Sequence, residues 1–235
     1  MSRPLVVLGV PHHHGEVHIE FMKSVLGMDK SDYDMGFVDC AGAEIVTSRN
    51  LIVQKFLEHP AKPTHLFFVD TDMGIPRDGI SKLLSADKPI VSGVAVAKYS
   101  NLWVSKYWGD LWDGLHNVQY DACESRDLRE AHWIPKDEYR GKVLEIGATG
   151  AACILIKREV FEKIPYPWFY NEFNPNASGH KELSYMSEDI SFCYKAKKYG
   201  IGVHLHLGVL CDHWAGVKKF PPFWEKPKAV AEETK

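Results

Sequence analysis

The nine residues Thr64-His-Leu-Phe-Phe-Val-Asp-Thr-Asp72 decide the fold of this chain. Their first part is rich in β-branched and aromatic side chains and predicts a buried strand. That strand ends on two carboxylates, Asp70 and Asp72, and in an open parallel α/β sheet the ligand crevice lies just outside the strand ends. Two oxygen ligands there can hold Mg²⁺ or Mn²⁺ against a phosphate-bearing substrate. In the structural alternative, one aspartate turns the chain and the other caps the next helix.

Strands and helices alternate on both sides of this stretch, which predicts an α/β fold with a mostly parallel central sheet flanked by helices. The first expected strands are 5–10, 34–38, 66–69 and 89–96, and the first expected helices are 16–26, 42–59 and one that starts at Pro76. The Trp-rich segment 98–141 shows no sustained period, and we interpret it as a small antiparallel or loop excursion. Regular elements are expected again at 143–146, 151–156, 158–164, 187–199 and 203–207.

The composition predicts one soluble α/β domain, residues 1–217, followed by a mobile tail rich in proline and charge, 218–235. Apolar residues make up 45% of the 235 residues and charged residues 25%, as in ordinary globular proteins. The net charge of −3 lacks the basic footprint of a nucleic-acid-binding protein. Five scattered cysteines without a CxxC pair predict reduced thiols and a cytoplasmic location. We expect no signal peptide and no transmembrane segment.

Arg49 is the first candidate outside the aspartate pair. Its spacing from Ile45, Ile52 and Phe56 places it on the apolar face of the expected helix 42–59. An unpaired buried guanidinium costs several kcal/mol, so it needs an anionic partner. Arg49 could instead extend its guanidinium to solvent, or it could pair with a core carboxylate such as Asp39. The functional alternative is the diphosphate of a bound substrate, which the planar guanidinium suits.

Two further candidates lie near the end of the chain. Ser187, Glu188 and Asp189 open a helix whose dipole favours acids in its first turn, so simple capping explains them. Alternatively, a carboxylate there could take a proton from an acceptor hydroxyl. His213 follows the last strand, and a neutral imidazole could complete a mixed oxygen and nitrogen shell that suits Mn²⁺, although a lone histidine is more often structural.

Three smaller features are left with open interpretations. The segment 147–150, Gly-Ala-Thr-Gly, permits either close approach of a ligand to the backbone or a bulge. The consecutive histidines 12–14 follow the first strand, and we interpret them as polar loop filling, with donor contact as the second choice. His204 and His206 share one face of the last strand and are interpreted as a pair on a sheet edge.

Taken in order, these pieces resemble the nucleotide-sugar-dependent glycosyltransferases of the GT-A fold, in particular the family-2-like enzymes. The resemblance covers residues 5 to about 214. It rests on an ordered set of motifs: Thr47-Ser-Arg-Asn50, the DxD segment Phe68-Val-Asp-Thr-Asp72, Gly147-Ala-Thr-Gly150 before Ile154–Phe161, Ser187-Glu-Asp189 and His213. The Trp-rich segment and the histidines 12–14 match no part of that pattern.

The resemblance implies a role for individual residues. Asp70 would contact the ribose or the metal, while Asp72 and His213 would bind the metal that bridges the donor diphosphate. Asp189, with Glu188 beside it, would be the catalytic carboxylate on the acceptor side, the general base if the enzyme inverts. The donor site would be lined by Pro11, Asp39, Arg49, Asp70, Thr71 and Gly150.

The function implied is transfer of a hexose from a UDP- or GDP-sugar to an acceptor hydroxyl, with Mn²⁺ or Mg²⁺ as the cofactor. The acceptor is a glycan, a lipid-linked molecule or a small molecule, and homo-oligomerisation is left open. A sugar nucleotidyltransferase is the second enzymatic hypothesis, but residues 10–15 lack the Gly-rich, basic loop that such enzymes use. The non-enzymatic hypothesis is a catalytically inactive carbohydrate-binding domain.

Overall fold

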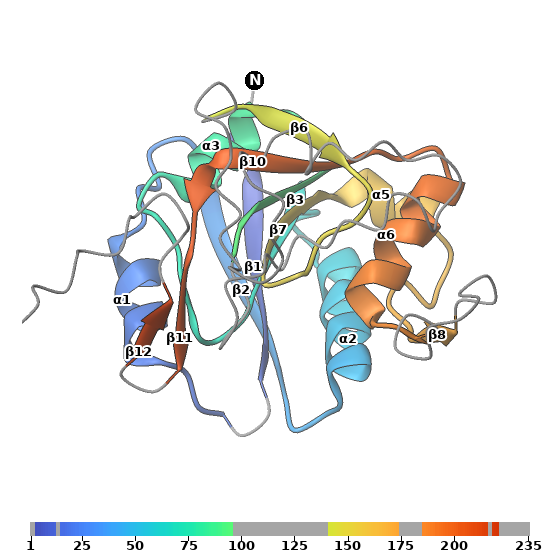
Figure 1. Cartoon of the computed structure of the whole chain (residues 1–235), viewed down its shortest axis with the longest axis horizontal. Helices are drawn as coiled ribbons and strands as arrows, with labels where there is room; N and C mark the ends of the chain where they lie inside the picture. The colour runs from blue at the N-terminus through green and yellow to red at the C-terminus, as the bar shows by residue number, and fades with distance from the viewer. Residues whose placement is uncertain (1–2, 13–14, 96–140, 174–184, 216–217, 221–235) are drawn as a thin grey trace, which may run out of the picture.

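A seven-stranded sheet forms the centre of the computed structural model, which describes residues 3–12, 15–95, 141–173, 185–215 and 218–220 (Figure 1). The strand order is β2-β1-β3-β7-β5-β10-β6. The strands are β1 Leu5–His12, β2 Asp34–Ala41, β3 His65–Val69, β5 Ile90–Val94, β6 Val143–Ile146, β7 Cys153–Lys157 and β10 Val203–Leu210. All of them run in one direction except β7 and β6, so the prediction of a mostly parallel sheet is confirmed.

Helices cover both faces of the sheet. The helices are α1 Ile19–Gly27, α2 Ile45–Glu58, α3 Gly79–Ser85, α5 Arg158–Lys163 and α6 Glu188–Lys198. On one face α2, α5 and α6 pack into one hydrophobic cluster, and on the other α1 and α3 pack into a second (Figure 1). The core therefore has two layers, separated by the sheet.

Strand β3 joins these two layers because its side chains alternate between them. Leu66 and Phe68 belong to the cluster under α2, whereas Phe67 and Val69 belong to the cluster under α1. All four side chains are fully buried, as the apolar run predicts. Burial on both faces fixes this strand in the middle of the sheet and so fixes the position at which Asp70 and Asp72 emerge.

The antiparallel direction of β7 determines which loop lies beside the carboxyl end of β3. Val69 at the end of β3 pairs with Cys153 at the start of β7, and the Asp70 amide donates to the Ala152 carbonyl at 3.2 Å. The loop 147–150, which precedes β7, thus lies next to the carboxyl end of β3. A parallel strand would have placed it at the opposite end.

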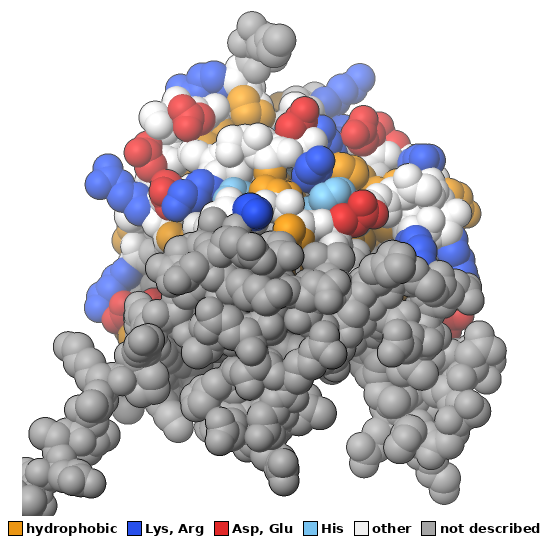
Figure 2. Space-filling model, turned by 45° about the horizontal axis from the view of Figure 1, so that its top comes forward, with side chains coloured by type: hydrophobic (Ala, Val, Ile, Leu, Met, Phe, Trp, Pro, Cys, Tyr) orange, Lys and Arg blue, Asp and Glu red, His pale blue; other side chains and the backbone are white. Residues whose placement is uncertain are grey.

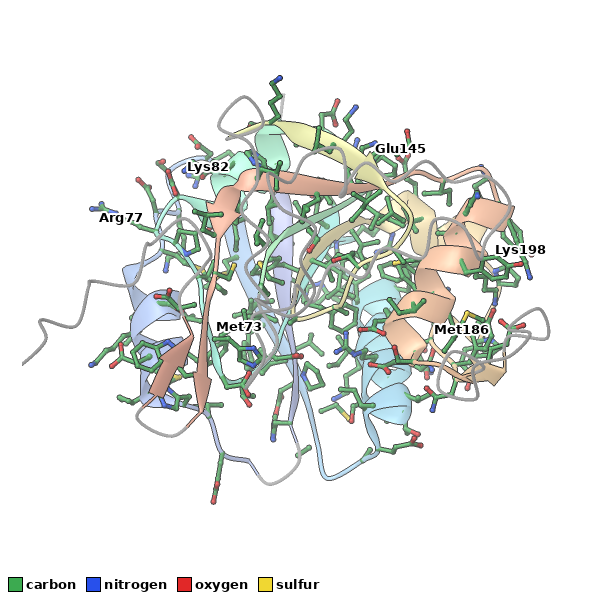
Figure 3. All side chains as sticks on the ribbon, in the orientation of Figure 1. Met73, Arg77, Lys82, Glu145, Met186 and Lys198 are labelled. Carbon is green, nitrogen blue, oxygen red and sulfur yellow. The ribbon has the colours of Figure 1, made fainter. Side chains whose placement is uncertain are left out.

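Two small sheets complete the described structure. One has the order β12-β11-β4 and is formed by β4 Met73–Gly74, β11 Asp212–Ala215 and β12 Lys218–Phe220. The other pairs β8 Glu172–Phe173 with β9 Tyr185–Met186. Figure 3 places Met73 and Met186 toward the same end of the central sheet, away from Lys82 and Glu145. The chain just after Asp72 and the chain just before Ser187 therefore approach the same end.

Several predicted elements differ from the structure in their limits. Helix α3 begins at Gly79 rather than Pro76, because the Gly79 amide closes a turn onto the Pro76 carbonyl at 2.8 Å. The interpretation of His204 and His206 as a sheet-edge pair is wrong, because β10 lies between β5 and β6. The expected tail from residue 218 begins with strand β12, and residues 221–235 lie outside the described residues.

The expected excursion at 98–141 also lies outside the described residues, apart from Gly141. Among the helices that the structure describes, none combines the length and apolar character needed to cross a bilayer. On the face seen in Figure 2, acidic and basic side chains of the described residues are interspersed rather than gathered by sign. This distribution agrees with the small net charge of the sequence.

Candidate functional site

The candidate site lies where β3 ends. The chain leaves β3 through a turn in which the Met73 amide donates to the Asp70 carbonyl at 3.1 Å. The Thr71 carbonyl within this turn accepts from the His18 amide at 2.8 Å, which ties the turn to the start of α1. Asp70 and Asp72 therefore stand on a backbone held by hydrogen bonds, and their side chains meet different partners.

Asp72 meets His213. Its Oδ1 lies 3.4 Å from His213 Nε2, and the two side chains are 25% and 12% exposed. The main chain brings them together, because His213 pairs with Met73 across β11 and β4, and the Trp214 amide donates to the Asp72 carbonyl at 2.9 Å. The Trp214 ring also stacks on His18 at 5.4 Å. An imidazole nitrogen and a carboxylate oxygen at this separation can both reach one cation.

This pair falls short of a complete protein cage. Within the described ranges, no cluster of three or more His, Cys, Asp or Glu side chains is arranged to hold a metal ion. The resemblance implies that Asp70 contacts either the ribose or the metal, and in the structure its carboxylate forms an ion pair with Arg49. A cation at Asp72 and His213 would need its remaining ligands from substrate or water, as Mg²⁺ sites commonly have.

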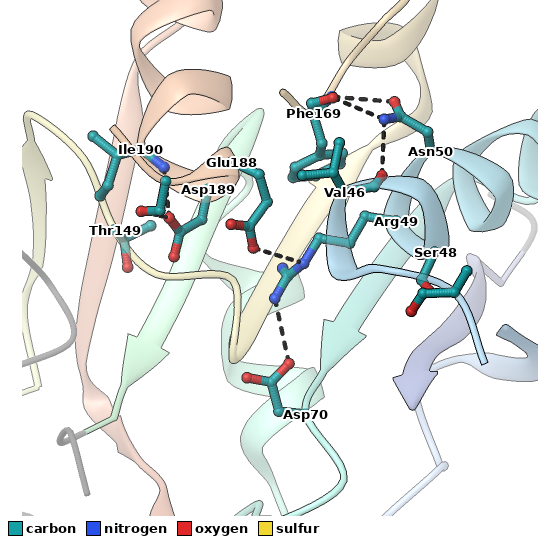
Figure 4. Close-up of polar contacts among 12 residues, drawn as sticks. Val46, Ser48, Arg49, Asn50, Asp70, Thr149, Phe169, Glu188, Asp189 and Ile190 are labelled. Carbon is teal, nitrogen blue, oxygen red and sulfur yellow. Dashed lines mark hydrogen bonds and ion pairs between the residues drawn. The ribbon is translucent and has the colours of Figure 1, made fainter. Parts of the chain in front are cut away.

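Arg49 forms the second cluster, together with Asp70 and Glu188 (Figure 4). Its Nη2 lies 3.4 Å from Asp70 Oδ1, and its Nε lies 3.3 Å from Glu188 Oε1. The Arg49 side chain is only 4% exposed, and its guanidinium carbon lies over the rings of Phe68 and Phe169 at 5.6 and 5.8 Å. Arg49 thus links the end of β3 to the start of α6.

The partner of Arg49 corrects one expectation. Asp39 was the core carboxylate expected beside Arg49, but it pairs instead with His12, whose Nε2 lies 3.0 Å from Asp39 Oδ2. The Gly15 amide donates to the other ring nitrogen of His12 at 2.9 Å, so Nε2 carries the proton given to Asp39. This hydrogen bond lowers the pKa of Asp39. Asp39 and Pro11 both lie near the carboxyl ends of their strands, β2 and β1.

Burial dominates the electrostatics of the Arg49 cluster. Desolvation raises the pKa of Asp70 above its ordinary value, and the positive charge of Arg49 only partly opposes this. Desolvation likewise raises the pKa of Glu188, again against the effect of Arg49. The charges of Asp72 and Asp189 push the pKa of Asp70 further up. One buried cation is therefore shared between two carboxylates that the protein interior disfavours as anions.

The adjacent acids Glu188 and Asp189 occupy different environments. Glu188 is buried against Arg49, whereas Asp189 is half-buried at the first turn of α6. Asp189 Oδ1 accepts from the Ser187 hydroxyl and from the Ile190 amide, the latter at 2.8 Å. Ser187 is the residue that caps α6, as predicted, but its hydroxyl bonds the Asp189 carboxylate rather than a free amide. The structure therefore gives two neighbouring carboxylates two separate partners.

Two buried polar residues hold the walls of the site, and the sequence analysis assigned neither a role. Thr149, from the loop before β7, donates to Ser92 Oγ of β5 at 3.1 Å, and its carbonyl accepts from Cys193 Sγ of α6 at 3.6 Å. Asn50, next to Arg49, donates to the carbonyls of Val46 and Phe169. A polar residue on an apolar helix face was the available signal for Asn50.

Comparison with known proteins identifies the fold. No family model and no curated protein matches the sequence. The crystal structure of A197 from STIV superposes with a TM-score of 0.59 at 15% identity, over 92% of this chain and 90% of that chain. The structure of GalNAc-T7 with UDP, GalNAc and Mn²⁺ gives 0.52 at 12% identity, over 91% of this chain but 44% of that one.

The chain therefore spans less than half of the GalNAc-T7 chain that it matches. At such low identities a shared fold is what these superpositions demonstrate. The mixed sheet, its flanking helices and these matches agree on one architecture. The protein has a GT-A-like fold.

Proposed function

We propose that this protein transfers a hexose from a nucleoside-diphosphate sugar to an acceptor hydroxyl, with the help of a divalent cation. The observation that carries the proposal is the meeting of Asp72 and His213, some 140 residues apart in sequence, at 3.4 Å beside the end of β3. This is the end at which open α/β sheets bind nucleotides. A GT-A-like fold and a neighbour crystallised with UDP and Mn²⁺ support the same assignment.

The residues fit a hard or borderline cation. Asp72 offers a carboxylate oxygen and His213 an imidazole nitrogen, a mixed set that suits Mn²⁺ better than Mg²⁺. Few protein ligands are expected when phosphate oxygens of the substrate complete the shell. When bound, the cation would neutralise the charge that develops on the leaving diphosphate. Asp72 and His213 would hold it, and Arg49 and Asp70 would line the neighbouring wall.

Asp189 is the residue that we assign to proton transfer. In the transfer step, the acceptor oxygen bonds to the anomeric carbon, and the bond from that carbon to the diphosphate oxygen breaks with its electron pair. The hydroxyl proton passes to a carboxylate. Asp189 is half-buried in the first turn of α6, whereas Glu188 is engaged by Arg49. We therefore assign Glu188 the role of holding Arg49 in place and Asp189 the role of base in an inverting reaction.

The other residues that we assign to the donor site lie near the ends of strands or in the loops next to them. Pro11 and Asp39 lie near the ends of β1 and β2, and Thr71 lies in the turn after β3. Gly150 precedes β7, which runs antiparallel to β3 and so starts beside Asp70. We propose that these residues surround the nucleotide, since the fold brings their segments to one edge of the sheet.

The test combines turnover with direct measurement of metal binding. The full chain would be incubated with a panel of UDP- and GDP-hexoses and Mn²⁺, and release of UDP or GDP measured beside Asp72→Ala. Electron paramagnetic resonance of Mn²⁺ would report binding independently of turnover. We expect release of one nucleotide and weaker Mn²⁺ binding in the variant. If no donor is bound or turned over and Asp72→Ala behaves like the wild type, the proposal is wrong.

A further inference from the structure

A groove lies between the outer side of α2 and the segment 166–170, which form its two walls. Its volume is about 290 Å³, close to the lower end of the range for small-molecule sites. Thr47 and Gln54 of α2 form one side, and Tyr166, Phe169 and Tyr170 form the other. None of the residues proposed to bind the donor or the cation, or to transfer the proton, lines this groove.

We propose that this groove binds a neutral sugar residue of the acceptor glycan, away from the hydroxyl that reacts; the class of ligand rests on the proposed function. The first argument is charge. None of the described side chains that line the groove is charged. The nearby Lys195 ammonium lies over the Tyr170 ring at 5.4 Å and donates to the carbonyls of Pro165 and Pro167 at 2.7 and 2.8 Å. The groove therefore suits a neutral ligand and not a phosphate or a carboxylate.

The second argument is the combination of ring faces and neutral polar groups. A pyranose carries C–H bonds on its faces and hydroxyls around its rim, so it needs an apolar platform beside hydrogen-bonding groups. Tyr166 and Tyr170 supply rings with phenolic hydroxyls, and Thr47 supplies a hydroxyl. Gln54 supplies its amide oxygen as an acceptor, while its Nε2 donates to Glu58 Oε1 at 2.9 Å. Tyr166 is 71% exposed, so its ring is accessible to a ligand in the groove.

The third argument is rigidity. Asn50 Oδ1 accepts from the amides of Trp168 and Phe169 at 3.0 and 3.2 Å, and its Nδ2 donates to the Phe169 carbonyl at 2.8 Å. The Trp168 indole donates to the carbonyls of Phe161 and Ile164, and its ring supports Tyr166 edge-on at 5.4 Å. The two sides of the groove are thus fixed before a ligand arrives, which lowers the ordering cost of binding.

The position of Phe169 relates the groove to the candidate site. Phe169, which is fully buried, is among the residues that line the groove, and its ring lies 5.8 Å from the Arg49 guanidinium (Figure 4). One aromatic side chain therefore separates the groove from the pair of Arg49 with Glu188. Glu188 is the neighbour in sequence of Asp189, the proposed base, and we therefore assign the groove to the acceptor side of the site.

The test measures sugar binding with matched tyrosine variants. Maltotriose, mannotriose and chitotriose would be titrated against the full chain and followed by saturation-transfer NMR. We expect Tyr166→Ala and Gln54→Ala each to weaken binding of one trisaccharide, Tyr166→Ala by at least about tenfold. Tyr199→Ala, which removes a ring 39% exposed outside the groove, should leave affinity unchanged. Thermal unfolding of each variant confirms that it is folded.

Asp72→Ala separates this proposal from the proposed function. The variant should bind the trisaccharide as the wild type does, because Asp72 does not line the groove. Trisaccharide binding in the groove without turnover of any donor would overturn the transfer proposal alone. Donor turnover with equal trisaccharide affinity in the wild type and Tyr166→Ala would overturn the groove proposal alone. Absence of saturable binding of all three trisaccharides, as expected if another segment of the chain fills the groove, also overturns it.

Discussion

Asp70 and Asp72 follow the same strand two residues apart, but they belong to clusters of different construction. Asp70 shares the buried Arg49 with Glu188, so its negative charge is balanced from within the protein. Asp72 lies beside His213, whose imidazole nitrogen can share a cation with a carboxylate oxygen. Arg49 links β3, α2 and α6 through its two ion pairs, and in the proposed function the pair of Asp72 and His213 would bind the cation.

Removal of His213 tests the ligand-binding half of this comparison and should have the largest effect. His213→Ala should lower Mn²⁺-dependent donor turnover by at least about a thousandfold, or about 4 kcal/mol in the barrier, because the cation loses a ligand. Mn²⁺ affinity should fall with it. Asp212→Asn is the matched control, since adjacent strand residues point to opposite faces. Equal Mn²⁺ affinity in His213→Ala and Asp212→Asn would contradict the assignment.

Removal of Arg49 tests whether the cluster of Arg49, Asp70 and Glu188 stabilises the fold. Arg49→Met should lower the free energy of unfolding by about 3 kcal/mol, because the buried Glu188 and the partly exposed Asp70 lose their shared cation. Denaturant unfolding followed by circular dichroism measures this loss. The control is Lys157→Met, which breaks the more exposed ion pair with Asp87 and should cost less than about 1 kcal/mol. Similar losses in the two variants would show that the Arg49 cluster is not a structural support.

The pH dependence of stability tests whether Glu188 has a structural role or a catalytic one. We expect it to be the smallest of the three effects. Burial raises the pKa of Glu188, so the folded chain binds its proton more tightly than the unfolded chain. Its contribution to stability is therefore complete below the ordinary pKa of 4.5 and is lost as the pH rises through the raised pKa. The slope is at most about 1.4 kcal/mol per pH unit.

Glu188→Gln should remove the contribution of Glu188 to the pH dependence of stability while leaving donor turnover measurable. Urea unfolding from pH 4 upward would show a flatter decline in the variant than in the wild type. Glu162→Gln, at a carboxylate 55% exposed, makes the same chemical change and should leave the decline intact. Parallel pH profiles for the wild type and Glu188→Gln, with loss of turnover in the latter, would move Glu188 to the catalytic side of the comparison.

Local signals in the sequence were sufficient for the order of the helices and of the strands of the central sheet, but not for the short strands of the two small sheets. The apolar run of β3 and the alternation around it predicted the sheet, because burial on both faces requires an unbroken apolar strand. The direction of β7 could not be predicted in this way, since an apolar run reads the same in either direction. The relation of Asp72 to His213 came from a resemblance, and the structure places them in contact while their metal-binding role stays a prediction.

The partners of Arg49 could not be predicted from residue patterns in the sequence. Periodicity correctly placed Arg49 on a buried face and required an anion there. Asp39 was a reasonable choice because it ends the preceding strand, but His12 engages it. Glu188 lies far away in the sequence, and only the packing of α6 against the sheet brings it to Arg49. Contacts of this kind depend on topology rather than on neighbouring residues.

The pairing of β11 with β4 also has a consequence for the order in which the molecule becomes functional. During synthesis the chain emerges from its N-terminus, so β3 and Asp72 are made long before residue 213. His213 reaches Asp72 only after β10 has joined the sheet between β5 and β6 and β11 has paired with β4. An incomplete chain can therefore bury much of its first layers and still lack the cation pair. A strand made after most of the central sheet thus completes the proposed catalyst.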